Sequence, residues 1–165
     1  MWRICLLLVI ACGSNDPNIT KPPSNTAPAA KPAATDDKVE DVAVRFARAA
    51  LSGDRATAMS LTLTFDEMAK LSNKARDRAD YDAEVNHLLD KLAKEGAEFG
   101  GAITGAKVVQ TESLDPATDE KVLQKIEFAV VEITVKEADG REHAAPFPWF
   151  FLKAAGAGWK YSPKK

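Results

Sequence analysis

The hydrophobic period of this chain changes after Gly100-Gly101, and this change constrains the fold more than any other feature. Before the glycine pair, apolar residues recur every three to four positions, which is typical of amphipathic helices. After it, apolar and polar residues alternate in segments rich in β-branched and aromatic residues, which predicts strands. Helices followed by strands, rather than alternating with them, indicate an α+β domain with an antiparallel sheet.

Two helices are expected at the start of this domain. Asp37-x-x-Glu40 has the form of a capping box, with Asp in place of the usual Ser or Thr, and it predicts a helix that ends at Gly53. Asp54 directly follows this glycine and is suited to cap a short second helix.

Two further helices are expected before the glycine pair. Thr64-x-x-Glu67 is a capping box for the third helix. The fourth is the strongest prediction and is expected to end at Gly96. Its apolar stripe consists of Tyr81, Val85, Leu88 and Leu92.

The strands are expected to form a meander. Asp139-Gly140 is typical of a two-residue β-hairpin turn, and Asp115-Pro116 and the segment 155–158 mark the turns on either side. The predicted strand segments are 104–114, 121–138, 141–154 and 159–161.

The hairpin turn predicts a register for the sheet. If Ala138 lies opposite Arg141, one face of the sheet is aromatic, and we expect the helices to cover it. This face would carry Ile126, Phe128, Val130, Phe147, Trp149, Phe151, Trp159 and Tyr161. The other face would carry Ala129, Val131, Ile133, Val135, Pro146, Pro148, Phe150 and Leu152. A bulge near Val131 or Glu132 would exchange the outer halves of the two faces.

The second face is also apolar, although helices on one side of a sheet can cover only one face. An exposed apolar patch of this size usually marks an interaction surface. A homodimer is therefore expected to form through the residues Val131, Ile133, Phe150 and Leu152.

The chain begins with a short cationic and apolar leader. Arg3 precedes an uncharged run from Ile4 to Cys12, which is shorter than the roughly 20 apolar residues of a transmembrane helix. This pattern is typical of a secretory signal. An ordinary signal cut after Ala11, without lipid attachment, and an intracellular protein remain as alternatives.

Val9-Ile10-Ala11-Cys12 resembles the lipobox of bacterial lipoproteins. The resemblance implies a signal peptide over residues 1–11 and a lipid with fatty acyl chains, such as palmitate, that anchors Cys12 to a membrane. The expected location is the bacterial cell envelope. Gly13, in place of an Asp that favours inner-membrane retention, slightly favours the outer membrane.

Residues 12–37 are expected to form a disordered tether. They include five of the nine prolines and no aromatic residue, so they cannot bury enough apolar surface to offset the entropy of ordering. The folded domain then spans residues 38–165. Cys5 and Cys12 are the two cysteines of the chain, which leaves this domain without a thiol. A formal charge of −2 provides no basic surface for nucleic acid.

Three features of the chain resemble one superfamily: the order of helices before the sheet, the run Phe46–Asp54 and the closing strand Gly156-x-Gly158-Trp159-Lys160. This is the nuclear transport factor 2-like (NTF2-like, also SnoaL-like or cystatin-like) superfamily. The resemblance covers about residues 38–163. It implies a cone-like sheet curved around a helix, with an apolar pocket and dimers through the outer sheet face. Members include isomerases, dehydratases and binding modules, so the resemblance does not determine the function.

The aromatic face suggests a ligand pocket, although a filled core is the interpretation that we favour. The candidate pocket residues are Phe128, Glu132, Phe147, Trp149, Phe151, Trp159 and Tyr161. Without the bulge, Glu132 would lie on this face, where burial would raise its pKa and suit it to proton transfer. With the bulge, which we favour, it faces solvent.

The other polar candidates indicate no catalytic centre. His87 is expected on the solvent face of the fourth helix and His143 near the rim of the hairpin, and their spacing is not that of a metal site. Lys153 is expected to extend past Trp159 to the sheet edge.

The sequence as a whole favours a non-enzymatic, lipid-anchored binding or assembly module without cofactor or metal. The alternatives are a small-ligand carrier or an isomerase-like or dehydratase-like enzyme that uses the aromatic pocket, and a structural spacer in an envelope complex.

Overall fold

The computed structural model describes residues 37–73, 76–137, 139–145 and 148–163. The predictions for residues 1–36, which include the signal peptide, Cys12 and most of the tether, lie outside the described residues. The same holds for the predictions on Ala138, Pro146 and Phe147.

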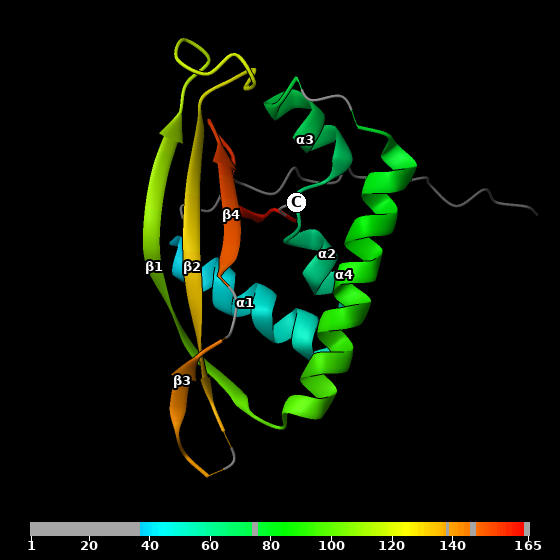
Figure 1. Cartoon of the computed structure of the whole chain (residues 1–165), viewed down its shortest axis with the longest axis vertical. Helices are drawn as coiled ribbons and strands as arrows, with labels where there is room; N and C mark the ends of the chain where they lie inside the picture. The colour runs from blue at the N-terminus through cyan, green and yellow to red at the C-terminus, as the bar shows by residue number, and fades with distance from the viewer. Residues whose placement is uncertain (1–36, 74–75, 138, 146–147, 164–165) are drawn as a thin grey trace, which may run out of the picture. The chain divides into compact units, whose positions relative to one another are not determined.

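Helices precede a single antiparallel sheet in the order of the chain (Figure 1). The helices are α1 (Val39–Ser52), α2 (Arg55–Ser60), α3 (Phe65–Leu71) and α4 (Arg78–Phe99). The strands are β1 (Ala102–Leu114), β2 (Ile126–Lys136), β3 (Glu142–Ala144), β4 (Trp149–Ala154) and β5 (Lys160–Tyr161). Sheet neighbours follow the chain, with β3 and β4 both paired to β2, so the α+β fold with a curved antiparallel meander is confirmed.

Local capping determines where the short helices begin. The Asp54 carboxylate accepts a hydrogen bond from the Thr57 backbone N–H at the start of α2. Thr64 and Glu67 form the predicted capping box of α3, each side chain accepting from the backbone N–H of the other. The capping box predicted at Asp37 is not formed, because the Asp37 carboxylate pairs with Arg45 and Lys38 takes the N-cap position.

Helix α4 continues past Gly96 to Phe99 and ends at Gly100, which adopts the left-handed conformation at φ 60°. The predicted end at Gly96 is therefore wrong. Gly96 instead lies against the C-terminal end of α1, where a Cβ atom would come within 2.0 Å of the Leu51 carbonyl oxygen. Glycine at this position allows the two helices to approach closely, a requirement that the sequence pattern does not distinguish from a helix stop.

Helix α1 lies between the sheet and α4 (Figure 1). Helix α1 contacts α4 and also β1, β2, β4 and β5. Ala43, Phe46, Ala47 and Ala50 are almost fully buried, so α1 is the central element of the core. None of the helices within the described ranges has the length and the apolar composition of a membrane span.

The predicted register of the hairpin is wrong by one residue. Gly140, at φ 87°, closes a turn in which the Glu137 N–H donates to the Arg141 carbonyl, and Lys136 lies opposite Glu142. The register of β2 with β4 differs again from its register with β3. Val131, rather than Val130, lies opposite Trp149, and Ala129, rather than Phe128, lies opposite Phe151.

The shifted register exchanges the faces of β2. Ala129, Val131, Ile133 and Val135 belong to the main core together with Trp149, Phe151 and Tyr161, and β2 contacts α1. Val131 and Ile133 are 0% exposed. The predicted dimer surface is therefore not available as proposed, because two of its four members are buried within the chain. Phe150 and Leu152 are only partly buried.

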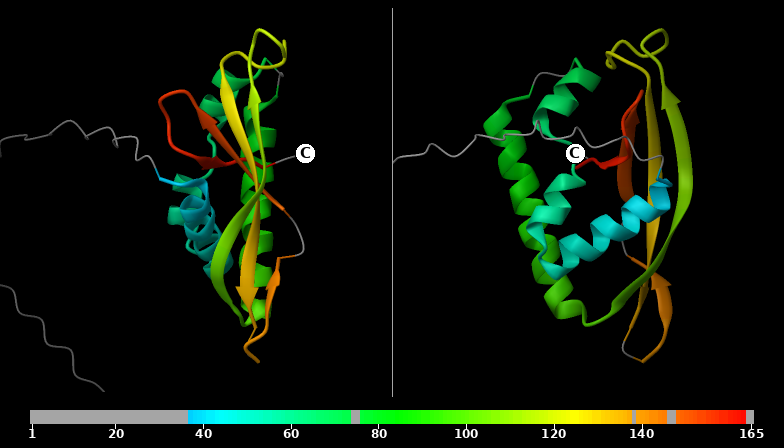
Figure 2. Two further views of the ribbon diagram at one scale, coloured as in Figure 1. Left: turned by 90° about the vertical axis from the view of Figure 1, so that its left-hand side faces the viewer. Right: turned by 180° about the vertical axis from the view of Figure 1, so that it is seen from behind.

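The strong twist of the sheet explains why both faces of β2 are apolar. In the left view of Figure 2, β1 and β2 cross each other along their length. Ile126 lies on the opposite face of β2 from Ala129, yet it is buried in a second cluster with Leu63, Leu71 and Val122 around α3. The helices all lie on one side of the sheet, as expected, and the twist turns alternate residues of β2 toward that side at its two ends (Figure 1).

Candidate functional site

Aromatic side chains from the sheet converge on one residue of α1. Phe46 is stacked on Tyr161 with 4.1 Å between ring centroids, and Trp149 and Phe151 meet it edge-on at 5.4 Å and 6.2 Å. Trp149, Phe151 and Tyr161 are thus brought together as the aromatic face predicts. Phe46 fills the space between them, so this part of the interior is packed core.

The remaining aromatic candidates lie elsewhere. Phe128 is opposite Leu152 and stacks with Phe150 on the face away from α1. Trp159 is partly buried, and the Nζ of Lys153 lies 5.9 Å from its ring centroid, as expected for a lysine that extends to the sheet edge. Phe128 is displaced because the sequence-based register is one residue off.

Glu132 lies on the face of β2 that points away from the main core. It alternates with the buried residues Val131 and Ile133 and is paired across the ladder with Lys107 of β1. Glu132 faces outward because β2 pairs with β4 in a register one residue away from the predicted one. The predicted bulge in β2 at this point is not the cause. An enzymatic role that places Glu132 inside the aromatic cluster is therefore excluded.

A small pocket lies beside the aromatic cluster, between α4 and the start of β4. Its volume is about 190 Å³. One wall comes from α4 and the other from the sheet. The lining residues are Leu88, Lys91, Leu92, Glu95, Pro148, Trp149, Phe150 and Tyr161. We call this the α4–β4 pocket; two residues of the predicted aromatic pocket, Trp149 and Tyr161, line it.

Trp149, which lines this pocket, carries an unusual chemical feature in its buried ring nitrogen. The residue is 6% exposed, and its indole Nε1–H is buried without a hydrogen-bond partner in the described part of the chain. Buried polar groups in proteins almost always have a partner, and an unsatisfied one costs free energy. The sequence predicts a buried tryptophan here, but it contains no signal that the indole donor would be left unpaired.

The ionisable groups around the pocket are poorly suited to proton transfer near neutral pH. Burial raises the pKa of Tyr161 to about 12, so its hydroxyl remains protonated. At the rim, the Lys91 ammonium lies 3.6 Å from the Glu95 carboxylate, one helical turn away on α4. The pocket thus combines a mostly apolar lining with one ion pair at its rim.

A larger hollow of about 770 Å³ lies where α1 meets the start of β1, and it contains two arginines. Arg45 pairs with Asp37, and Arg48 donates to the Ile103 carbonyl at 3.0 Å. Each guanidinium therefore already has a partner within the chain.

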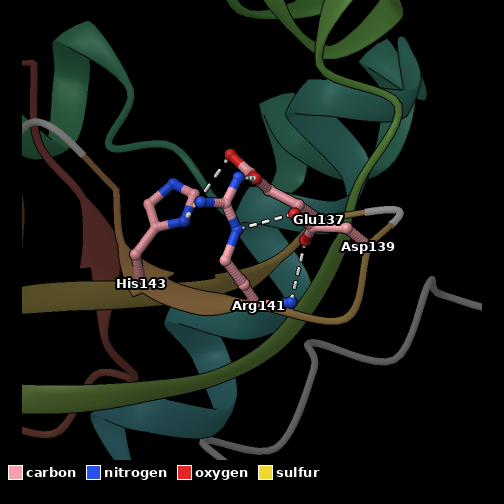
Figure 3. A network of polar contacts seen from close by, with 4 residues as sticks. All are labelled: Glu137, Asp139, Arg141 and His143. Carbon is pink, nitrogen blue, oxygen red and sulfur yellow. Dashed lines mark hydrogen bonds and ion pairs between the residues drawn. The ribbon is translucent and has the colours of Figure 1, made fainter.

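The β2–β3 hairpin carries a network of polar side chains (Figure 3). Arg141 contacts the carboxylates of both Asp139 and Glu137, and the Nδ1 of His143 lies 3.8 Å from Glu137. These side chains are largely exposed, and exposed ion pairs of this kind contribute little to stability. His143 thus lies at the hairpin rim as expected, and His87 is exposed on α4. Among the described residues, no group of three or more potential metal ligands occurs.

Comparison with known proteins adds little to this geometry. No family model matches the chain, and no curated protein matches it. One solved structure that is similar to this chain is named an NTF2-like transpeptidase from Campylobacter jejuni. The alignment covers 75% of this chain and 96% of that chain, at 15% sequence identity and a TM-score of 0.47. A likeness of this strength carries no argument about family or function, and the NTF2-like resemblance stays a prediction.

Proposed function

We propose that this protein is a lipid-anchored envelope protein whose α+β domain binds a small molecule in the α4–β4 pocket without transforming it. The observation that carries the binding proposal is the pocket of about 190 Å³ beside the aromatic cluster, whose lining includes Leu88, Leu92 and Trp149. A pocket with apolar walls and few polar groups is typical of small-molecule sites. The protonated Tyr161 and the Lys91–Glu95 pair favour binding over acid–base catalysis.

Thermal unfolding with a library of small aromatic and aliphatic compounds tests the binding proposal. A compound that binds the folded state raises the unfolding temperature, and about 2.7 kcal/mol is gained at a concentration 100 times the Kd. Leu88→Trp is designed to fill the pocket and should abolish the shift. Val109→Trp places the same side chain at an exposed position on β1 and should leave the shift unchanged. Equal shifts in both variants would contradict a site at this pocket.

The anchoring proposal depends on Cys12, which the lipobox resemblance identifies as the lipidated residue. Two acyl chains suffice for stable membrane attachment, whereas a nine-residue apolar run cannot span the bilayer. Cys12→Ser should move the protein from the membrane fraction to the soluble fraction, and mass spectrometry of the wild-type N-terminal peptide should show the acyl mass. Cys5→Ser is the matched control, because it lies in the segment that cleavage removes. Membrane retention of Cys12→Ser would contradict the anchor.

A further inference from the structure

We infer that two copies of this chain associate edge to edge through β1, which pairs antiparallel with β1 of the second copy about a twofold axis at Gln110. The partner of this edge is therefore a second copy of the same chain. The inference goes beyond the proposed function, because it concerns the edge of the sheet and not the α4–β4 pocket.

Strand β1 forms one edge of the sheet. It pairs with β2 on one side, and no other described strand pairs with its second side (Figure 1). Residues 109–113 are all exposed, with Val109 at 45%, so this part of the strand is open to solvent on both faces. The start of the strand differs, since the Ile103 carbonyl accepts a hydrogen bond from Arg48 of α1. An open edge strand presents backbone N–H and C=O groups that can pair with a strand of another chain.

A β-bulge decides which side chains of β1 share a face. The register with β2 shifts at Val109, so that Lys107 lies opposite Glu132 and Glu112 lies opposite Phe128. Opposite residues in a ladder share a face, and Glu132 and Phe128 are an even number of positions apart on β2. Lys107 and Glu112 are an odd number of positions apart and would lie on opposite faces of a regular strand. The bulge therefore brings a cation and an anion to one face of the edge.

This face of the edge is complementary to itself. When Gln110 lies opposite Gln110 of the second copy and the bulged Val109 is left out of the ladder, each Lys107 lies opposite Glu112 of the other copy. The twofold symmetry forms this charge pair twice, and the two Gln110 amides, which both donate and accept, meet at the axis. Opposite charges directly across a strand pair stabilise it. Both charges are available, because the ion pairs among the described residues involve other side chains.

The second face and the length of the edge indicate how strong the association is. In the same register Val108 lies opposite Thr111 of the second copy, and β-branched residues of this kind favour strand pairing. One short ladder buries less surface than a standard interface of roughly 1,600 Å², so we expect a weak dimer that forms at about 100 µM. Unfolding measurements well below this concentration therefore report on the single chain.

Sedimentation velocity of the full chain carrying Cys12→Ser, at about 100 µM under reducing conditions, should show the dimer. Lys107→Glu and Glu112→Lys should each weaken the association about tenfold or more, since two pairs of opposite charge become pairs of like charge. Lys94→Glu makes the same change at an exposed position on α4, away from the edge, and should leave the association unchanged.

Mixing the two charge variants provides the sharpest test. In an equimolar mixture of Lys107→Glu and Glu112→Lys, every opposing pair between unlike copies again has opposite charges, so the mixture should dimerise. A chain that carries both substitutions should also dimerise with itself. A role of either residue in folding alone predicts no such recovery.

Oxidative cross-linking tests the position of the axis. Opposite Cα atoms in an antiparallel ladder lie about 4.5–5.5 Å apart, which is within the range of a disulfide. In a chain with Cys5→Ser and Cys12→Ser, Gln110→Cys should form a disulfide-linked dimer, and the addition of Lys107→Glu should reduce the yield. Lys94→Cys on α4 should remain a monomer.

The outcomes separate this inference from the proposed function. A monomer at the stated concentration would overturn the inference. A dimer that neither charge reversal weakens would overturn the edge and indicate another surface. Weakening by both reversals without recovery in the mixture would overturn the pairing of Lys107 with Glu112. The shift of the unfolding temperature by a compound in the α4–β4 pocket is measured on the single chain, so the proposed function stands or fails separately.

Discussion

The two tyrosines show how burial changes the chemistry of single residues in this protein. The Tyr81 hydroxyl donates to the Leu63 carbonyl at 2.6 Å inside the core, and Tyr161 is stacked on Phe46. Burial is the largest cause of the raised pKa of both residues, to about 12 in each case, from an ordinary value of 10.0. The charged tyrosinate is disfavoured because the low-dielectric core solvates it poorly.

This shift predicts a pH dependence of stability. Above pH 10 the unfolded chain releases the phenolic protons while the folded chain retains them, so the unfolded state binds fewer protons. The contribution of the tyrosines to stability is therefore complete below pH 10 and is lost as the pH rises from 10 toward about 12. Since the chain has two tyrosines, tyrosinate absorbance reports both. The folded protein should show almost no tyrosinate at pH 10, and a half-ionised signal at that pH would contradict the burial of both rings.

At the scale of the element, residues close in sequence determine where a helix ends, whereas contacts between helices depend on residues that are distant in sequence. Gly53 adopts a left-handed conformation at φ 75° and ends α1, as its position predicts. Gly96 is also a glycine, but it lies inside α4, where the absence of a side chain permits the close contact with Leu51. The difference comes from the neighbouring helix, which is remote in sequence.

Gly96→Ala should therefore destabilise the protein by about 2 kcal/mol, because the added Cβ would displace the two helices. This loss exceeds the roughly 1 kcal/mol that alanine gains over glycine within a helix. The free energy of unfolding in urea measures the effect. Gly105→Ala on β1 is the matched control, since its Cβ would meet nothing within 4 Å, and it should have little effect. A Gly96→Ala variant as stable as the wild type would argue against the close helix approach.

At the scale of the whole domain, the twist of the sheet determines which residues form the core. The apolar residues on both faces of β2 indicate an interaction surface when the sheet is taken as flat. In the structure, α1 and α4 cover the Ile133 side and the α3 region covers the Ile126 side. Residues from both apolar faces therefore contribute to the core of a single chain.

Ile133→Ala tests this arrangement. Ile133 is 0% exposed, so its truncation should cost about 3 kcal/mol of unfolding free energy through lost burial and a residual cavity. Val109→Ala, at a position that is 45% exposed on β1, should change stability by less than about 0.5 kcal/mol. A small effect at Ile133, combined with a change in oligomeric state by sedimentation, would instead favour the dimer surface predicted from the sequence.

The order of the elements, the capping of α2 and α3 and the end of α1 at Gly53 could all be predicted from local sequence. These features depend on residues within a few positions of one another, where hydrogen bonds and hydrophobic period act directly. It also identified Trp149 and Tyr161 as members of one aromatic group. The prediction of lipid attachment at Cys12 likewise rests on the sequence alone.

Four features depend on contacts between distant segments: the register of β2 against β4, the outward position of Glu132, the role of Gly96, and the α4–β4 pocket beside the unpaired indole of Trp149. A shift of one residue in a strand pairing moves every side chain to the other face, and such a shift is set by turn geometry and packing along the whole strand. The pocket combines α4 with β4 and β5, and whether the indole finds an acceptor depends on atoms from all of them. Contacts between segments so distant in the chain leave no local pattern in the sequence.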